Sequence, residues 1–285
     1  MSREGDSAET TDPLVWLRFA LECAAEADRL AEAAFGTVPR VVRKPDLTYV
    51  TETDVAIEQA IRQRIERSFP DHGIVGEELA ARVGESGLRW YIDPIDGTHN
   101  FLRGIPIFAT LLALERDGVL EVAVVSAPAL RRRWHAVRGQ GAALSIEGSP
   151  PQPIRISDVA TLEEAQILYS SPARLMRDVR LPGFASVLDR CWRERGFGDF
   201  WGYMLVAEGA AEAMIEVGIQ PYDLAAPVLI VEEAGGVVTN FQGLPDRSGE
   251  SVLAGNRLLH PELLRALRTP ADDVAIASAS EKRPS

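Results

Sequence analysis

The stretch Trp90-Tyr91-Ile92-Asp93-Pro94-Ile95-Asp96-Gly97-Thr98-His99-Asn100-Phe101 joins an apolar run to two acids, a proline and a glycine. The apolar run predicts a buried strand that stops at Asp93 and Pro94, and Gly97 with the following threonine predicts the start of a short helix. Divalent metals take oxygen ligands, and the N-terminus of a helix attracts phosphate. The stretch can therefore bring a metal and a phosphate to one point. A plain surface turn is the alternative, since Asp, Pro and Gly are common turn residues.

Acids elsewhere in the chain favour the metal interpretation. Glu77 and Glu78 follow the short apolar run Ile74-Val75, so they lie at the end of another predicted strand. Asp223 directly precedes an apolar helical stretch, Leu224 to Val231. Taken singly, the glutamates could be solvated loop acids and the aspartate a helix N-cap. Their combination with the first stretch favours a metal site.

Together these motifs resemble the inositol monophosphatase superfamily of magnesium-dependent, lithium-sensitive phosphatases, over residues 13–268. The motifs occur in the family's order, and they are Lys44-Pro45-Asp46-Leu47, Val50-Thr51-Glu52-Thr53-Asp54, Gly76-Glu77-Glu78, the stretch from Asp93 to Phe101, Glu216, Tyr222-Asp223-Leu224-Ala225-Ala226 and Glu232-Glu233-Ala234-Gly235-Gly236. One departure is Tyr222, where the family usually has tryptophan. Both residues are aromatic.

The resemblance implies an α+β fold, the layered αβαβα sandwich of the inositol monophosphatase and fructose-bisphosphatase type. Hydrophobic periodicity alone indicates a mixture of helices and strands. It predicts helices over 13–34, 53–68, 184–195, 200–211 and 261–267, and strands over 107–113, 119–125, 134–137, 213–216, 237–240 and 252–255. We expect an amino-terminal half (13–145) with most metal ligands and a carboxy-terminal half (146–269) with Asp223 and the specificity segment. Polar tails, 1–12 and 270–285, are predicted to be disordered.

The resemblance also implies a site with two or three Mg²⁺ ions. The implied ligands offer hard oxygen atoms. They are Glu77, Asp93 and the main-chain carbonyl of Ile95 for the first ion, and Asp93, Asp96 and Asp223 for the second. A third, loosely held ion would lie near Glu77 and Asp54.

In the implied reaction a metal-activated water attacks a phosphate monoester, so no Ser or Cys nucleophile is needed. Thr98, hydrogen-bonded to Asp54, would orient that water, and Glu77 would take part through its metal. The N–H groups of Gly97 and Thr98 would hold phosphate oxygens, and Asp96 and Asp223 would also border the substrate. His99 invites a general-acid role, but a rim histidine is the interpretation we prefer.

Substrate choice is predicted from the segment Arg195-Gly196-Phe197-Gly198-Asp199-Phe200-Trp201-Gly202-Tyr203. It resembles the RxxGDFxxY pattern of the monofunctional histidinol-phosphate phosphatases, although Arg195 is one residue out of register. Asp199 and Glu216 could pair with the ammonium and imidazole groups of histidinol phosphate. A helix N-cap is the alternative role for Asp199, and Glu216 also occurs in inositol phosphatases.

Two other functions stay open. One is the same chemistry on an inositol phosphate or a nucleotide 3′-phosphate, although Asp199 would repel the second phosphate of a nucleotide. The other is a regulatory protein without catalysis. Against that reading, every predicted ligand and water-activating residue is present in the chain.

Composition excludes several partners. The net charge of −12 over 285 residues argues against nucleic acid or an anionic membrane as a partner.

Cys23 and Cys191 show no spacing pattern, so we expect free thiols in the cytoplasm. The acidic start and the lack of a long apolar run predict neither a signal peptide nor a membrane span. The triplet Arg131-Arg132-Arg133 is predicted to be a solvated hairpin turn. By resemblance, we expect a homodimer acting on a small molecule.

Overall fold

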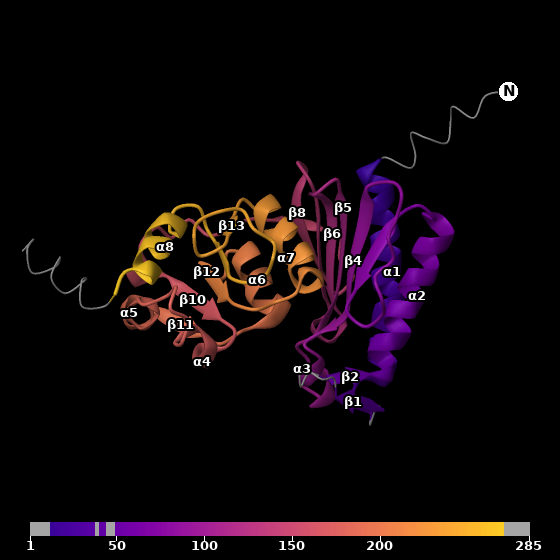
Figure 1. Ribbon diagram of the computed structural model, residues 1–285, viewed down its shortest axis with the longest axis horizontal. Helices are drawn as coiled ribbons and strands as arrows, with labels where there is room; N and C mark the ends of the chain where they lie inside the picture. Colours follow the sequence, from indigo (N-terminus) through magenta and orange to yellow (C-terminus); the bar gives the residue numbers. More distant parts are fainter. Residues whose placement is uncertain (1–11, 38–39, 44–48, 271–285) are drawn as a thin grey trace, which may run out of the picture.

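The structure is a computed structural model that describes residues 12–37, 40–43 and 49–270. Within these residues, helices and sheets alternate in five layers, as Figure 1 shows: two helices, a large sheet, two helices, a smaller sheet and a final group of helices. This arrangement confirms the predicted α+β class and the αβαβα sandwich. Most of both predicted tails, and the motif Lys44-Pro45-Asp46-Leu47, lie outside the described residues.

The larger sheet contains seven strands of the described chain, in the order β3-β4-β5-β6-β7-β8-β9. Their bounds are β3 (Gly73–Gly76), β4 (Leu88–Asp96), β5 (Ala109–Arg116), β6 (Val119–Ala127), β7 (Arg132–Val137), β8 (Gly141–Ile146) and β9 (Gln152–Ile154). β3 pairs in parallel with β4, and all later neighbours are antiparallel. The strand predicted from residue 107 begins only at Ala109, because Asn100 Nδ2 donates to the carbonyl of Ile107 and holds it in the preceding turn.

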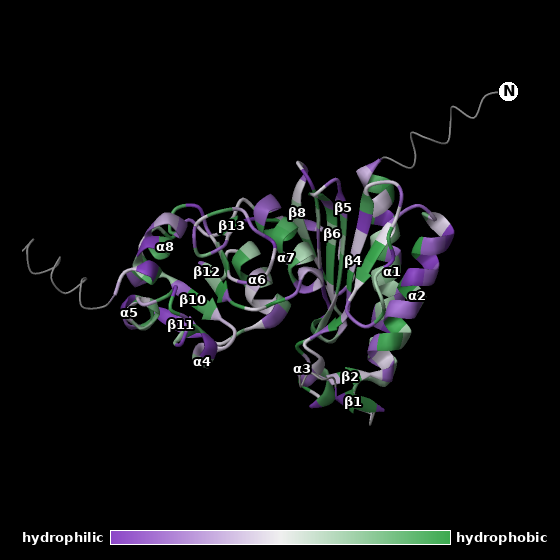
Figure 2. Ribbon diagram, viewed as in Figure 1, coloured by the Kyte–Doolittle hydropathy of each residue, from purple (hydrophilic) through white to green (hydrophobic). Residues whose placement is uncertain are grey.

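Two amphipathic helices, α1 (Pro13–Ala34) and α2 (Glu52–Ser68), cover one face of this sheet. Both start at capped positions. Asp12 Oδ1 accepts an N–H of the first turn of α1 at 2.9 Å, and Thr51 and Asp54 cap α2 reciprocally. Apolar residues of the strands pack against the helices, and Figure 2 shows green, apolar stretches on the strands beside α1. The predicted bounds of these helices agree to within one residue.

The smaller sheet contains five strands of the described chain, in the order β11-β10-β12-β14-β13. Their bounds are β10 (Gln166–Tyr169), β11 (Arg193–Arg195), β12 (Ala213–Glu216), β13 (Val237–Thr239) and β14 (Val252–Gly255). Its outer side carries α4 (Pro172–Leu175), α5 (Phe184–Arg190) and α8 (His260–Arg268). The helix predicted over 184–195 is wrong beyond Arg190. Residues 193–195 form an edge strand instead, because they pair in parallel with β10.

The middle layer consists of α6 (Asp199–Ala207) and α7 (Pro221–Glu233), which lie between the two sheets. All residues from 224 to 231 are buried, as expected for a helix that is apolar on every side. α6 ends four residues before its predicted end, because Gly209 adopts a left-handed φ of 71° that terminates the helix. None of the helices in the described ranges combines the length and apolarity needed to span a bilayer.

The remaining short elements connect these layers. β1 (Val41–Arg43) and β2 (Tyr49–Thr51) form an antiparallel pair that precedes α2. The 3₁₀ turns η2 (Pro128–Leu130) and η3 (Leu162–Glu164) follow β6 and precede β10. α3 (Thr98–Leu102) follows β4 and belongs to the site described below.

The predicted hairpin turn at the arginine triplet is wrong for two of its three residues. Arg131 occupies a left-handed turn position with φ 54°, but Arg132 and Arg133 belong to β7. Arg132 Nη1 donates to both carboxylate oxygens of Glu208 at 2.9 and 2.8 Å, and Trp134 Nε1 donates to the same carboxylate at 2.8 Å. Glu208 directly follows α6, so these bonds tie the middle layer to the larger sheet.

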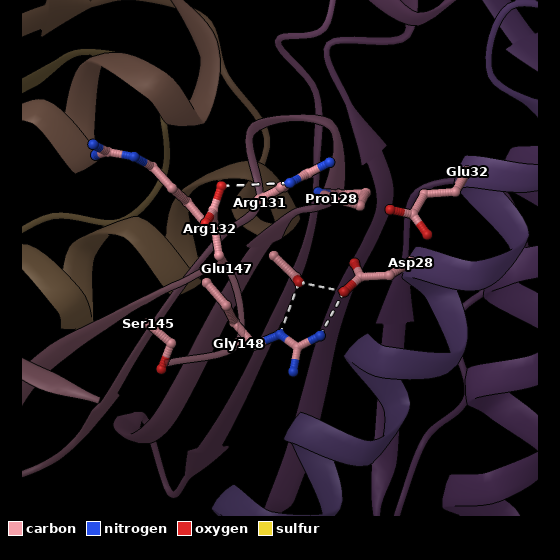
Figure 3. A pocket seen from close by; sticks show the side chains of 10 residues that line it. Asp28, Glu32, Pro128, Arg131, Arg132, Ser145, Glu147 and Gly148 are labelled. Carbon is pink, nitrogen blue, oxygen red and sulfur yellow. Dashed lines mark hydrogen bonds and ion pairs between the residues drawn. The ribbon is translucent and has the colours of Figure 1, made fainter. Parts of the chain in front are cut away.

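Arg133 makes a second tie, to the outer helix α1. It pairs with Asp28, and Ser126 Oγ lies 2.9 Å from Asp28 Oδ2 and from Arg133 Nε. These groups border a cavity of about 430 Å³, shown in Figure 3, in which Arg131 also pairs with Glu147. Among the charged residues that line this cavity, Asp28, Arg131, Arg132, Arg133 and Glu147 have partners within the protein.

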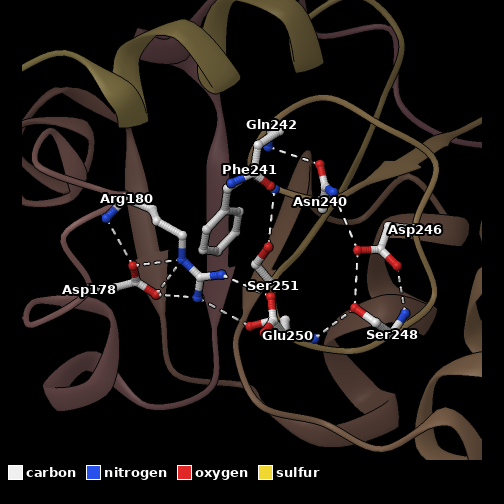
Figure 4. A network of polar contacts seen from close by, with 9 residues as sticks. All are labelled: Asp178, Arg180, Asn240, Phe241, Gln242, Asp246, Ser248, Glu250 and Ser251. Atoms are coloured by element: carbon white, nitrogen blue, oxygen red, sulfur yellow. Dashed lines mark hydrogen bonds and ion pairs between the residues drawn. The ribbon is translucent and has the colours of Figure 1, made fainter.

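Local polar contacts also fix the long connection between β13 and β14, shown in Figure 4. Asn240 Oδ1 accepts the N–H groups of Gln242 and Leu244 at 2.9 and 3.0 Å. Arg180 binds Asp178 through two nitrogens and also reaches the carbonyl of Glu250 at 3.3 Å. The connection is thereby held against the outer side of the smaller sheet.

The tie through Glu208 predicts unequal effects of the same substitution at neighbouring arginines. Arg132→Met should lower the free energy of unfolding by about 1.5–3 kcal/mol, the value of a hydrogen bond to a charged group. Arg131→Met is the matched control and should change it by less than about 0.5 kcal/mol, since its pair with Glu147 is exposed. Urea unfolding monitored by tryptophan fluorescence measures both. Equal losses would contradict the assigned role of Arg132.

Candidate active site and metal centre

β4 carries two of the predicted metal ligands through an irregular end. Its pairing with β5 sets Asp93 opposite Leu111 and Asp96 opposite Ala109, so β4 contains one extra residue between the pairs. Such a bulge redirects side chains at the end of a strand. The strand therefore ends at Asp96 and not at Asp93 and Pro94 as predicted, because pairing resumes after the bulge.

Gly97 turns the chain from β4 into α3, the predicted short helix. Its φ of 86° is left-handed, a conformation that glycine adopts without penalty. A Cβ at this position would also lie only 3.0 Å from the carbonyl oxygen of Ile107. The glycine is thus required by both conformation and space, and it sets the position of Thr98 at the first turn.

The structure gathers four of the predicted acids into one cluster. Asp93 is 2% exposed, and burial raises the pKa of its carboxyl well above the usual range. The negative charges of Glu77, Asp96 and Asp223 raise the pKa of Asp93 further. These residues come from the end of β3, from β4 and from α7, so three elements converge on the cluster.

Asp223 links this cluster to the start of α7. It is the third residue of the helix, where its Oδ2 accepts the N–H of Gln220 at 3.0 Å. The predicted N-cap alternative is therefore replaced by a capping box in which Gln220 is the N-cap. Asp223 also shares a hydrogen bond with Asp93, and burial raises the pKa of Asp223 to about 7.

The donor set fits a hard divalent cation. Asp93 Oδ1 is buried and has no hydrogen-bond partner, a costly arrangement that a bound cation would relieve. Carboxylates this close repel each other unless a proton or a cation intervenes. In the described ranges, no three His, Cys, Asp or Glu side chains are arranged, as they stand, so that they could hold a metal ion together. One oxygen of Asp96, Oδ2, accepts the N–H of Phe200 at 2.5 Å.

Asp54 and Thr98, the predicted water-orienting pair, lie beside the cluster. Thr98 Oγ1 is 3.4 Å from Asp54 Oδ1 and 3.0 Å from the carbonyl oxygen of Ile95. The other oxygen of Asp54 accepts the N–H of Thr51 at 2.8 Å and also contacts the Thr51 hydroxyl. Burial raises the pKa of Asp54, and the bonds from Thr51 oppose that shift. Thr51 belongs to a motif quoted above but was assigned no role there, although its spacing from Asp54 is that of a capping box.

A cleft of about 650 Å³ adjoins the acids and contains both predicted specificity residues. Asp199 is exposed as a residue where it lines this cleft, although its surroundings partly bury the carboxyl, and its φ of 57° is left-handed. It makes no side-chain cap, since Gly198 is the N-cap of α6, so the alternative role as an N-cap is wrong. Glu216 is buried, accepts the Tyr203 hydroxyl at 2.8 Å, and has a pKa that burial raises to about 8.

The two residues with uncertain predicted roles differ in position. His99 is exposed, lines the cleft, and makes an edge contact with the ring of Tyr49. Burial raises the pKa of Asp199, and the charge of His99 opposes that shift. Arg195 lies on β11, donates to the carbonyl of Glu194 at 2.6 Å, and is not among the residues that line the cleft. Arg174 of α4 does line it and was missed, because no local motif marks it.

Residues 12–271 match the sequence profile of the inositol monophosphatase family. The chain belongs to that family. Members are phosphatases and typically depend on a metal, so this protein is a phosphatase of the hydrolase class. Its fold agrees, since the SuhB extragenic suppressor protein of Bartonella henselae superposes with a TM-score of 0.82 at 31% identity, covering 88% of this chain and 98% of that one.

Two curated relatives are closer in sequence. A histidinol-phosphatase of Mycobacterium tuberculosis is 44% identical over 88% of this chain and 97% of its own length. A histidinol-phosphatase of Streptomyces coelicolor is 42% identical over 79% of this chain and 86% of its own length. Among phosphatases of this family, the chain is therefore similar to enzymes named for histidinol phosphate.

The clustered acids predict that stability falls as pH rises when no metal is bound. The pKa values of Asp93, Asp223 and Glu216 lie above the values of about 4 expected in the unfolded chain. The folded protein therefore holds protons that the unfolded chain releases, and the melting temperature should drop by several degrees between about pH 5 and about pH 8. Calorimetry with a chelator present measures this slope.

Asp93→Asn should reduce that slope and raise the melting temperature at about pH 8, because it removes one buried acid. The same variant should lose metal-dependent phosphate release. A variant with an unchanged slope, or with substantial activity, would remove Asp93 from the centre of the cluster.

Proposed function

We propose that this protein is a magnesium-dependent histidinol-phosphate phosphatase, which converts L-histidinol phosphate and water into L-histidinol and phosphate. The observation that carries the proposal is the position of Asp199 and Glu216 in a cleft that adjoins the cluster around Asp93. Two acids beside a phosphate-hydrolysing centre suit a leaving group that carries positive charge. The similarity to enzymes named histidinol-phosphatase supports the same choice and, with it, a role in histidine biosynthesis.

The metal assignment is the one that the family resemblance implies, and the donor chemistry of the cluster suits it. Glu77, Asp93 and the carbonyl of Ile95 would hold one Mg²⁺, Asp93 with Asp96 and Asp223 would hold another, and Glu77 with Asp54 would border a third. When bound, the ions lower the pKa of a water and neutralise the leaving oxygen. The partnerless oxygen of Asp93 supports this assignment.

The protein's own groups position the reactants. Thr98 Oγ1 lies between Asp54 and the Ile95 carbonyl, so its hydroxyl can donate to one of them and accept a hydrogen bond from the attacking water. The N–H groups of Gly97 and Thr98 would hold phosphate oxygens, as the bulge and the left-handed glycine bring them to the cluster. Asp96 and Asp223 would also border the substrate.

Glu216 and Asp199 would recognise the leaving group. The raised pKa of Glu216 means that the proton of its carboxyl is held near neutral pH. A bound ammonium group lowers the pKa of a nearby carboxyl and stabilises its charged form. Asp199 would pair with the second cationic group, since the residue is exposed and lines the cleft.

Further proposals concern the chain as a whole. We infer a division into halves 13–145 and 146–269, inhibition by lithium, and a cytoplasmic location that suits the two free cysteines.

We also infer a homodimer, supported by exposed apolar residues in one segment, Met176, Val179 and Trp192, which are 55, 93 and 66% exposed. Sedimentation should then give twice the 31.1 kDa mass of the chain, and a monomer at micromolar concentration would contradict it.

The function is tested by Mg²⁺-dependent phosphate release from four monoesters: L-histidinol phosphate, inositol 1-phosphate, adenosine 3′,5′-bisphosphate and glycerol 2-phosphate. We expect kcat/KM for histidinol phosphate to be about a hundredfold above the others, the upper value for one charged hydrogen bond. A flat profile, or one led by inositol phosphate, would overturn the substrate while leaving the phosphatase chemistry in place.

Asp199→Asn gives a sharper test of the specificity residue. Asparagine keeps the shape of the side chain and tolerates the left-handed backbone, so the substitution removes only charge. It should lower kcat/KM for histidinol phosphate about ten- to hundredfold and leave glycerol 2-phosphate unchanged. Asp199→Gly also adopts the left-handed backbone without strain and removes the carboxylate. It should therefore lower kcat/KM for histidinol phosphate by a similar factor. Equal losses on both substrates would show that Asp199 does not select the substrate.

A further inference from the structure

A buried carboxylate on α2 holds the segment that directly follows Glu77. Glu58 has no solvent exposure, and its two oxygens point to main-chain N–H groups. Oε2 accepts the N–H of Glu78 at 2.7 Å, and Oε1 accepts the N–H of Leu79 at 3.2 Å. A charged acceptor strengthens both bonds.

Arg62, one turn later on α2, completes this contact. Its Nε lies 2.7 Å from Glu58 Oε1, so the buried charge is neutralised. Its other two nitrogens donate to the carbonyls of Ala80 and Leu79 at 2.9 and 3.0 Å. The pair therefore binds donors and acceptors of the same short segment and works as a clamp on residues 78–80.

Gly76 provides the space in which the clamp closes. A Cβ on Gly76 would lie 2.1 Å from Glu58 Oε1, a distance at which one of the two must move. On the other side, the N–H of Glu77 donates to the carbonyl of Ile92 at 3.2 Å, next to Asp93. The main chain is thus fixed immediately before and after Glu77, by β4 on one side and by the clamp on the other.

We propose that Glu58 is a positioning residue, which together with Arg62 fixes the main chain around Glu77 and so sets the affinity of the site for divalent metal. This inference rests on the proposed metal-binding role of Glu77. Groups that hold a ligating residue in place typically contribute ten- to hundredfold to metal affinity. In this proposal Glu58 acts through the main chain that its oxygens bind and is not itself a metal ligand.

The direct test is Glu58→Gln, assayed by Mn²⁺ titration in the absence of substrate, with free Mn²⁺ followed by electron paramagnetic resonance. Glutamine keeps the size of the side chain, but its amide cannot accept both N–H groups or neutralise Arg62. We expect Mn²⁺ affinity to fall about tenfold or more. Half-saturating Mg²⁺ in the phosphatase assay should rise by the same factor, while kcat at saturating Mg²⁺ largely recovers.

Gly76→Ala is an independent variant that keeps both charged side chains. Its methyl group should displace the Glu58 carboxylate from the N–H groups and reproduce the loss of metal affinity. Asp28→Asn is the matched control, because it breaks a different carboxylate–arginine pair, which lies on α1 away from the acids and is partly buried. It should lower the melting temperature as Glu58→Gln does, without changing Mn²⁺ affinity.

The outcomes separate this inference from the proposed function. If Glu58→Gln and Gly76→Ala are destabilised but bind Mn²⁺ as tightly as the wild type, Glu58 is only a structural residue and the inference fails. The phosphatase function would then stand unaffected. If the wild type neither binds Mn²⁺ nor releases phosphate from any monoester, the proposed function fails first.

Discussion

The confinement of mutually repelling carboxylates between two sheets is the constraint on which the rest of this structure depends. Asp93 and Asp96 lie on a strand of the larger sheet, and Asp223 lies on the helix packed between the sheets. Burying them costs free energy, which the packing of the apolar helix offsets at about 25 cal/mol for each Å² of apolar surface removed from water. Part of the free energy gained by packing the layers therefore offsets the cost of holding these charges where a reaction needs them.

The sequence was informative where residues close together in the chain determine the local structure. The helix over 13–34 and the strands over 213–216 and 252–255 were predicted with the bounds that the structure has. The turn at Gly97 was predictable because only a few residues adopt its conformation. These features depend on neighbours in the chain, and the helical or alternating period of apolar residues records them.

The sequence was less informative where contacts come from distant segments. Residues 193–195 continue a helical pattern but form a strand, because β10 offers them a free edge. Arg132 and Arg133 were predicted to lie in a solvated turn. They belong to the sheet instead, where Arg132 pairs with Glu208 and Arg133 pairs with Asp28. The roles of Arg174 and Glu58 depend wholly on such contacts, and no local spacing could have revealed them.

Asp199 shows what a single backbone angle implies for change over evolutionary time. Glycine, asparagine and aspartate adopt its left-handed conformation with little strain, whereas most other residues adopt it only at a cost in free energy. The Phe200 N–H bond to Asp96 anchors this conformation next to the acidic cluster. A descendant of this protein could therefore offer its substrate a negative charge, a neutral amide or open space at position 199 without rebuilding the loop. Larger or branched side chains would require a new path for the chain.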